Sequence, residues 1–330
     1  MKVIRRIWFG EELHEEAKEE LLLELQQMGR LFGFMPVRQN EEPSEVCLFN
    51  IPLSDVLHVF LNRRLRRLPR FAIITEPSIV LPYLKWSIWN RFFSCIFWLG
   101  KPLSSGPIYR KPHVFIDEID FPQVDGRNEA AVIVSRNKVS MTKGEMYTLR
   151  RQVIHGLDNL HVFGSGWSEP KGTRVFRAIK ESVIALATPG RFTFGVRRLF
   201  VMPKNYEGQV SDKHATLAKY RVVLAIENCQ ENLTEKLLDA WMAGCIPVYV
   251  GPTLSEFDIP DGLAIECGDS FEEVEVGLAR ALAMNHHEFS ERLKRWLFEE
   301  STLSVWSWEP AWKRIFDVEI SRSNHGGSLN

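Results

Sequence analysis

The chain has 330 residues, of which 45% are hydrophobic and 25% charged, and its formal net charge is −1. This length exceeds one ordinary hydrophobic core and fits two domains of about 150 residues each. The balanced charge lacks the basic footprint of a nucleic-acid-binding protein, so we expect no nucleic-acid partner. Five cysteines lie scattered in apolar runs without metal-ligand spacing. They are interpreted as buried free thiols, which suits a reducing, cytoplasmic compartment.

The N-terminal part is predicted to begin with a helix. The first twenty residues have no apolar core and turn acidic at once, which argues against a signal peptide. Leucine spacing predicts a helix over 11–28, and apolar runs predict strands over 45–52 and 71–75. Between these strands, a stretch ending in LNRRLRRLP is predicted to be helical, with its arginines forming a solvated face.

An aromatic segment at 86–100 is the most membrane-like stretch of the sequence. It is shorter than the roughly 20 apolar residues of a membrane span and contains an arginine, so we expect no transmembrane segment. Core packing is the favoured interpretation. Peripheral contact with a membrane surface, or with a lipid-linked substrate, is the alternative.

The C-terminal part alternates short apolar strands with helices after a boundary in the Pro- and Gly-containing stretch 120–130. This alternation predicts a parallel sheet that is covered on both faces. The expected domains are 1–126 and 127–320, followed by a polar, disordered tail at 321–330. Strands are predicted at 131–135, 160–166, 198–203, 221–227, 246–251 and 263–268, and helices at 145–157, 173–187, 213–220 and 234–244.

The stretch ENCQENLTEK at 227–236 places many polar side chains between a buried strand and a buried helix. In parallel sheets, ligands bind beyond the carboxyl ends of strands, where helix N-termini point free N–H groups. Thr234 is a good N-cap, which puts Glu235 and Lys236 in the first turn. A phosphate would meet the helix dipole and Lys236 there, and Glu235 could bind a ribose diol, while Glu227 and Asn228 could orient the loop or read a base edge. The alternative is that Thr234 only caps the helix and Glu235 only complements its dipole.

The longer stretch AIENCQENLTEKLLDAWMAGCIPVYVGP resembles the signature of the α-1,3/4-fucosyltransferases, glycosyltransferase family 10. That signature runs Phe-Glu-Asn-Ser, a spacer, Tyr-x-Thr-Glu-Lys, a helix, an Ala-Gly-x-x-Pro-Val strand and Gly-Pro. The resemblance implies an α/β fold of the GT-B type, with two Rossmann-like domains whose parallel sheets face a central cleft. The N-terminal domain would bind the acceptor and the C-terminal domain the donor.

The resemblance also implies an activity and roles for particular residues. The activity is an inverting, metal-independent transfer of fucose from GDP-β-L-fucose to a hydroxyl of an acceptor glycan, in an α-1,3-type linkage and without a cofactor. Glu235 would bind the ribose and Lys236 the phosphates. Arg150, seven residues before Leu157, matches the spacing of the family's phosphate-binding arginine. Arg151, the next residue, is the alternative candidate for this role. The other interpretation is that Arg150 is only a solvated arginine on the helix surface.

Two departures from the family pattern bear on the donor. The spacer between ENC and TEK has four residues where the family usually has six, and Asn232 stands in place of the spacer tyrosine. Another GDP- or UDP-sugar is therefore an alternative donor. A non-catalytic glycan-binding or scaffold protein on the same fold is a further alternative.

An inverting transferase needs a carboxylate that takes the proton of the acceptor hydroxyl. Glu76 follows a predicted strand directly, precedes Pro77, and resembles the family segment that carries the proposed base. The alternative is that Glu76 and Pro77 only form a turn at the end of the strand. Asp117, Glu118 and Asp120 are the other candidates, with an acidic interdomain loop as the alternative for them. The sequence has no HExxH, and no DxD beside a strand, so we expect no metal.

Overall fold

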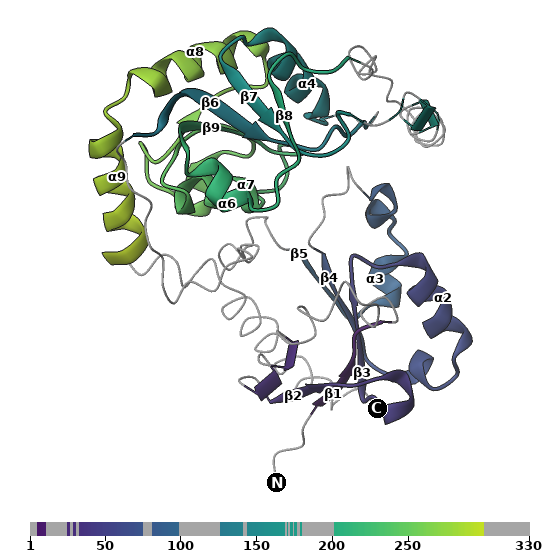
Figure 1. Cartoon of the computed structure of the whole chain (residues 1–330). Helices are drawn as coiled ribbons and strands as arrows, with labels where there is room; N and C mark the ends of the chain where they lie inside the picture. Colours follow the sequence, from purple (N-terminus) through teal and green to yellow (C-terminus); the bar gives the residue numbers. More distant parts are fainter. Residues whose placement is uncertain are drawn as a thin grey trace. The chain divides into compact units, whose positions relative to one another are not determined.

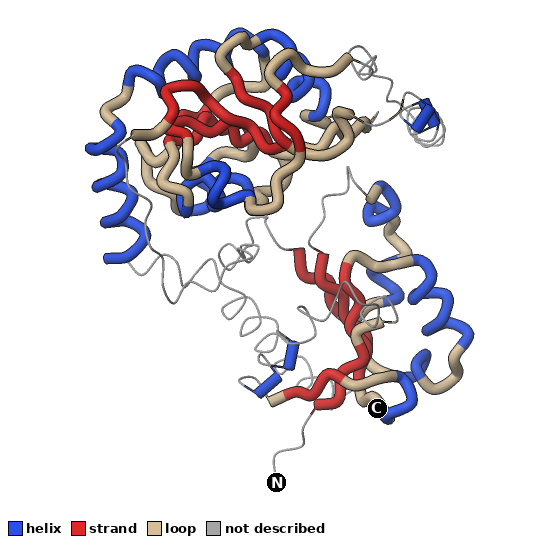
Figure 2. Tube along the Cα trace, in the orientation of Figure 1, coloured by secondary structure: helices blue, strands red, loops and turns tan. Residues whose placement is uncertain are grey.

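The computed structural model describes most of two α/β units, which are treated separately below (Figures 1 and 2). The described residues of the first unit lie within 5–98 and those of the second within 126–299. Residues 99–125 and 321–330 lie outside the described residues, so the expected domain limits and tail stay predictions. The described ranges are 5–10, 33–74, 81–98, 126–140, 144–168 and 201–299, with short pieces within 25–30 and 170–179.

The first unit contains a five-stranded parallel sheet in the order β2-β1-β3-β4-β5. The strands predicted at 45–52 and 71–75 are confirmed as β3 and β4. The other strands, only three or four residues long, are too short to give a periodic signal in the sequence. The strands are β1 (Arg5–Trp8), β2 (Phe34–Pro36), β3 (Glu45–Phe49), β4 (Arg70–Ile74) and β5 (Cys95–Trp98).

A helical layer packs on one face of this sheet. It consists of α2 (Leu53–Leu61), α3 (Trp89–Phe92), η4 (Leu65–Arg67) and η5 (Pro82–Lys85); a further turn, η3, spans Gln39–Glu41. Trp89 and Phe93 of the aromatic segment lie in the core between this layer and the sheet, which confirms core packing for these residues. The helix predicted at 11–28 lies almost entirely outside the described residues.

The second unit contains a six-stranded parallel sheet in the order β11-β10-β9-β6-β7-β8. Five of its strands match predictions. The strand predicted at 198–203 is wrong over its described part: 201–203 belong to no strand, Pro203 lacks an N–H for a ladder, and β8 follows instead. The strands are β6 (Asn128–Val134), β7 (Leu160–Phe163), β8 (Tyr206–Gly208), β9 (Tyr220–Ile226), β10 (Ile246–Val250) and β11 (Ile265–Glu266).

Helices cover both faces of this sheet, as predicted (Figures 1 and 2). α6 and α7 pack on the face that carries Val132 and Val223, and α4 and α8 lie on the other. Gly244 ends α7 in the left-handed region (φ 66°), as expected for a helix stop. The helix predicted at 173–187 lies mostly outside the described residues. The helices are α4 (Tyr147–Gly156), α6 (Lys213–Leu217), α7 (Glu235–Met242), α8 (Phe271–Ala283) and α9 (His286–Lys294), with turns η6 (Leu254–Phe257) and η7 (Arg295–Glu299).

The order of the strands defines where a ligand site is expected in the second unit. Counted from β6 as its first strand, the sheet has the order 3-2-1-4-5-6 of Rossmann domains. The chain leaves β6 toward β7 on one side and returns as β9 on the other. The carboxyl ends of β6 and β9 therefore form the switch point, where open α/β sheets bind ligands.

Two further expectations concern cysteines and membrane spans. None of the five cysteines forms a disulfide bond, as expected; Cys47, Cys229 and Cys245 are buried, whereas Cys95 and Cys267 are only partly buried. Within the described ranges, no helix combines the length and the hydropathy that crossing a bilayer requires.

Candidate functional site

A pocket lies at the switch point of the second sheet. Three cationic side chains line it, Arg150 from α4, Lys213 from α6 and Lys236 from α7. Grouped cations at strand ends beside a helix N-terminus suit an anionic ligand such as a phosphate. The remaining lining residues are Ile133, Val134, Ser135, Leu217, Val223, Leu224, Ala225 and Ile226.

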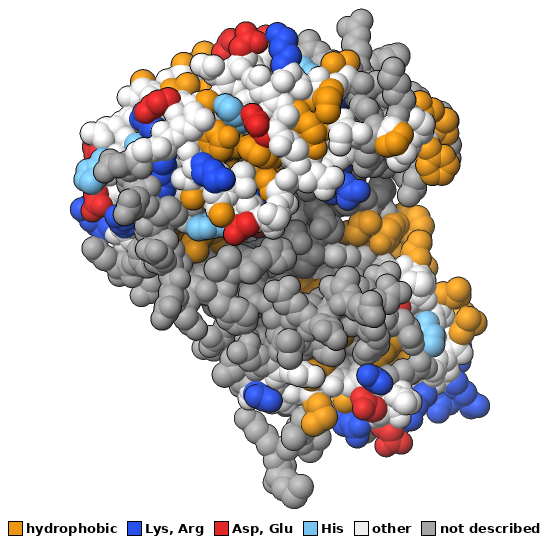
Figure 3. Space-filling model, viewed as in Figure 1, with side chains coloured by type: hydrophobic (Ala, Val, Ile, Leu, Met, Phe, Trp, Pro, Cys, Tyr) orange, Lys and Arg blue, Asp and Glu red, His pale blue; other side chains and the backbone are white. Residues whose placement is uncertain are grey.

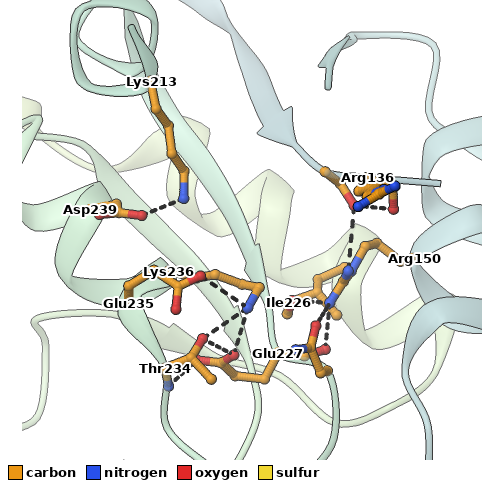
Figure 4. A network of polar contacts seen from close by, with 11 residues as sticks. Arg136, Arg150, Lys213, Ile226, Glu227, Thr234, Glu235, Lys236 and Asp239 are labelled. Carbon is orange, nitrogen blue, oxygen red and sulfur yellow. Dashed lines mark hydrogen bonds and ion pairs between the residues drawn. The ribbon is translucent and has the colours of Figure 1, made fainter. Parts of the chain in front are cut away.

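Arg150 connects α4 to the end of β9. Its Nη2 donates hydrogen bonds to the carbonyl oxygens of Ile226 and Glu227, both at 2.7 Å, and to Asn228 Oδ1 at 3.2 Å (Figure 4). The side chain is buried, and burial lowers the pKa of its guanidinium, partly opposed by Tyr147 and Glu227. Arg150 is therefore not a solvated helix arginine. It holds the start of the 227–236 loop while it lines the pocket.

Arg151, the alternative in register, has a different environment. It donates a hydrogen bond to the carbonyl oxygen of Lys138, and burial lowers the pKa of its guanidinium to about 10. It is not among the residues that line the pocket. Of the two neighbouring arginines, Arg150 is the one whose position fits a ligand in this pocket.

Glu227 is fully buried and holds the loop that follows it. Its Oε1 accepts a hydrogen bond from the Thr234 amide at 2.8 Å, and its Oε2 accepts from the Thr234 hydroxyl at 2.5 Å and from Lys236 Nζ at 3.1 Å. The carboxylate thus ties the end of β9 to the beginning of α7 (Figure 4). Of the two uses considered for Glu227, orienting the loop is the one that these contacts provide.

Thr234 is the N-cap residue of α7, as predicted, but its side chain does not cap the helix. The hydroxyl donates to Glu227 and accepts a hydrogen bond from Lys236 Nζ at 2.8 Å. The expected capping bond is wrong: the hydroxyl turns toward buried Glu227, to which it donates, and its oxygen accepts from Lys236 Nζ instead of from a backbone N–H of α7. Thr234 therefore helps to position Lys236 at the pocket.

Glu235 and Lys236 begin α7, as predicted from the sequence. Lys236 Nζ lies 3.8 Å from Glu235 Oε1 in addition to its contacts with Glu227 and Thr234. An ammonium has three N–H groups, and two of them serve these hydrogen bonds. The third N–H takes part in neither of these hydrogen bonds, and Lys236 lines the pocket.

Two basic residues near the pocket were not predicted as site residues. Lys213 forms an ion pair with Asp239 of α7 while it lines the pocket (Figure 4). Arg136, exposed, follows β6 two residues after its end and has no ion pair within the part of the chain that the structure describes. Their signal in the sequence, a basic residue next to a helix N-cap or a strand end, is too common to single them out.

A buried tyrosine and a glycine pack behind Glu227. Burial, reinforced by the charges of Glu227 and Glu266, raises the pKa of the Tyr249 phenol well above its usual range. A Cβ on Gly251 would come 2.6 Å from Tyr249 Cζ and 2.8 Å from Glu227 Cγ, so only glycine leaves room here. The backbone at Gly251 thus packs directly against the Glu227 side chain and restricts its position.

The candidates for the catalytic base are four carboxylates of the N-terminal part of the sequence. Glu76, two residues beyond β4, and the alternatives Asp117, Glu118 and Asp120 lie outside the described residues. Their roles stay predictions. Within the described ranges, no group of His, Cys, Asp and Glu side chains could hold a metal ion.

Comparison with known proteins shows the fold of the chain. No protein-family model and no curated protein sequence matches the chain. The crystal structure of Anabaena Alr3699/HepE in complex with UDP and glucose is similar at a TM-score of 0.54 and 10% identity, covering 98% of this chain and 100% of that one. With two parallel-sheet units, this likeness shows a GT-B fold built of Rossmann-like α/β domains, and so confirms the predicted fold class.

Two other solved structures are less similar. An α1,3-fucosyltransferase aligns at a TM-score of 0.47 and 13% identity, over 88% of this chain and 80% of that one. AviGT4, a glycosyltransferase involved in avilamycin A biosynthesis, aligns at 0.47 and 11% identity, over 99% of each chain. At these scores and identities, neither likeness assigns a donor or an acceptor.

Proposed function

We propose that this chain is a glycosyltransferase that transfers fucose from GDP-β-L-fucose, with inversion, to a hydroxyl of an acceptor glycan. The observation that supports a nucleotide-sugar donor is the pocket at the β6–β9 switch point, which is lined by Arg150, Lys213 and Lys236. The diphosphate of such a donor carries the negative charge that these cations complement. The resemblance of the 225–252 stretch to the fucosyltransferase signature supports fucose as the transferred sugar.

Each residue of the pocket has a role in this proposal. Lys236, with its third N–H, and Lys213 stabilise the negative charge on the departing GDP, and Arg150 adds charge while it holds the loop. Glu235, half-buried at the start of α7, accepts hydrogen bonds from the ribose hydroxyls. Glu76 is proposed as the base that takes the acceptor proton, and no metal or cofactor takes part.

A UDP-sugar donor is the second candidate. It is favoured by the UDP bound to HepE and by the four-residue spacer, in which buried Asn232 replaces the expected tyrosine. A non-catalytic glycan-binding protein on the same fold is the third candidate. The three differ in what they predict for nucleotide binding and for turnover.

A thermal-shift titration with GDP and with UDP separates the first two candidates. At a ligand concentration of 100 Kd, we expect GDP to raise the melting temperature by about 5 to 10 °C. Lys236→Ala and Lys213→Ala should each reduce this shift, measured against their own ligand-free melting temperature. Lys204→Ala is the matched control, because Lys204 is 85% exposed and forms a surface ion pair with Asp158, which is 90% exposed.

The outcomes decide between the candidates. A shift with UDP and none with GDP would refute the fucose donor, and a shift with neither nucleotide would refute both the GDP-sugar and the UDP-sugar candidate. Turnover is then measured with labelled GDP-fucose on an array of acceptor glycans. Nucleotide binding without any turnover would favour the non-catalytic candidate, whereas turnover that Lys236→Ala abolishes would exclude it.

A further inference from the structure

Helix α2 of the first unit exposes an apolar stripe to solvent. Its exposed residues recur at helical spacing, so they lie on one side of the helix, and the opposite side buries Asp55 and Val59. The domain therefore covers the side of the helix that carries Val59, which lies in the core, and leaves the apolar stripe uncovered. The stripe consists of Leu53, Leu57, Phe60 and Leu61, which are from 48% to 71% exposed.

A basic group follows the apolar stripe directly. Arg63, Arg64, Arg66 and Arg67, in and around η4, are all exposed, and the one carboxylate between 53 and 70 is that of buried Asp55. Arg64 pairs with Glu42 at 3.3 Å; the other three have no ion pair among the described residues. Figure 3 shows hydrophobic side chains along α2 and basic ones gathered beyond its end.

The apolar and basic groups are contiguous. The Arg66 guanidinium lies 5.9 Å from the centre of the Phe60 ring, at the junction between them. Single exposed hydrophobic residues are ordinary, but a stripe along a whole helix marks an interaction surface. The sequence-based interpretation of these arginines as a solvated face leaves the stripe beside them without an explanation.

We propose that α2 and η4 dock on the surface of an anionic lipid bilayer. Leu57, Phe60 and the other residues of the stripe would enter the boundary between headgroups and acyl chains, and the arginines would contact anionic headgroups. This combination of apolar side chains with neighbouring uncompensated positive charge is what such a surface attracts. The docking surface belongs to the first unit and does not depend on the donor pocket.

The charges argue against a second copy of this chain as the occupant. A two-fold dimer through this face would bring the same patch of both copies together, and with it both sets of arginines. The patch offers these arginines no opposite charge, because its one carboxylate, that of Asp55, is buried, and uncompensated positive charge at an interface opposes association. An anionic bilayer instead complements the same arginines.

Co-sedimentation of the full chain with lipid vesicles tests the proposal. The vesicles are phosphatidylcholine alone, or phosphatidylcholine with about 30% phosphatidylserine, a composition that gives a negative surface potential. We expect binding to the anionic vesicles, weakened by salt. Arg63→Glu with Arg67→Glu should lower that affinity at least about 20-fold, since each basic residue near an anionic leaflet contributes about fivefold.

Removing the apolar stripe is the second arm of the test. Leu57→Ser with Phe60→Ser should abolish sedimentation with the anionic vesicles. The matched controls are Val276→Ser, a 60% exposed apolar residue on α8, and Lys204→Glu, an exposed cation, both in the second unit. Both controls should bind as wild type does, and all variants should melt within about 2 °C of it, as exposed positions do.

Three results would overturn the proposal. These are wild-type protein that stays in solution with both kinds of vesicle, α2 variants that bind as well as wild type, and a wild-type dimer in light scattering that Leu57→Ser with Phe60→Ser converts to monomer. The third would make the stripe an interface between copies of the chain. None of these measurements involves a nucleotide, so failure here is distinct from failure of the proposed activity.

Discussion

Replacing Glu227 with glutamine should destabilise the second unit by about 3 kcal/mol. The buried carboxylate accepts three hydrogen bonds, from the Thr234 amide, the Thr234 hydroxyl and Lys236 Nζ. Glutamine turns one acceptor oxygen into an NH2 donor that faces other donors, and it leaves Lys236 without its anionic partner. Removing one partner of a buried pair costs about 3 to 5 kcal/mol, and the 18% exposure of the Lys236 side chain favours the lower end.

Thermal unfolding measures this loss. For a domain of this size, about 3 kcal/mol corresponds to a fall of about 6 to 12 °C in the melting temperature. Glu129→Gln is the matched control: Glu129 also forms an ion pair, with Arg221, but its side chain is 74% exposed, so the change should cost about 1 kcal/mol or less. If the two variants melted within about 2 °C of each other, the contacts of Glu227 would not be what holds the loop.

Two further predictions concern the core behind the site. Gly251→Ala would push a Cβ against Tyr249 and Glu227, so the free energy of unfolding measured in urea should fall by about 1 to 3 kcal/mol. Gly172→Ala is the control, because a Cβ there has nothing within 4 Å, and it should not lower this free energy. Equal losses in the two variants would contradict the packing argument. Burial raises the pKa of the Cys245 thiol from 9.0 to about 12. The folded chain then keeps a proton that the unfolded chain releases, so stability should fall as the pH rises from 9 toward 12. Cys245→Ala should lessen that fall, and an unchanged slope would refute this assignment.

Much of the second unit could be predicted from its sequence. Strands that are buried on both faces appear as unbroken apolar runs, which is why β9 and β10 were predicted within a residue or two. The start of α7 after Thr234 and its stop at Gly244 agree with the residue preferences at helix ends, although the Thr234 side chain makes no capping bond. Such signals depend on residues that are close in sequence, so they can be recognised without knowledge of the tertiary structure.

The contacts of the site residues could not be predicted in this way. Arg150 was interpreted as a ligand-binding or a solvated side chain, yet it donates to carbonyl groups 76 and 77 residues further along the chain. Thr234 was expected to cap its own helix, but its hydroxyl donates to Glu227. Lys213 was not singled out at all. Each of these outcomes depends on a partner that only the folded chain brings near.

The alternation of strands and helices and the polar character of the 227–236 loop can be predicted from local patterns, because hydrophobic periodicity and residue preferences at helix ends act over a few residues. The tertiary structure decided which side chains meet. Only the order of the sheet makes β6 and β9 neighbours, and that order places Arg150, Lys213 and Lys236 around one pocket. It likewise decided that the side of α2 that carries Val59 is covered while the apolar stripe stays exposed, since burial depends on what the chain packs against rather than on hydrophobicity alone.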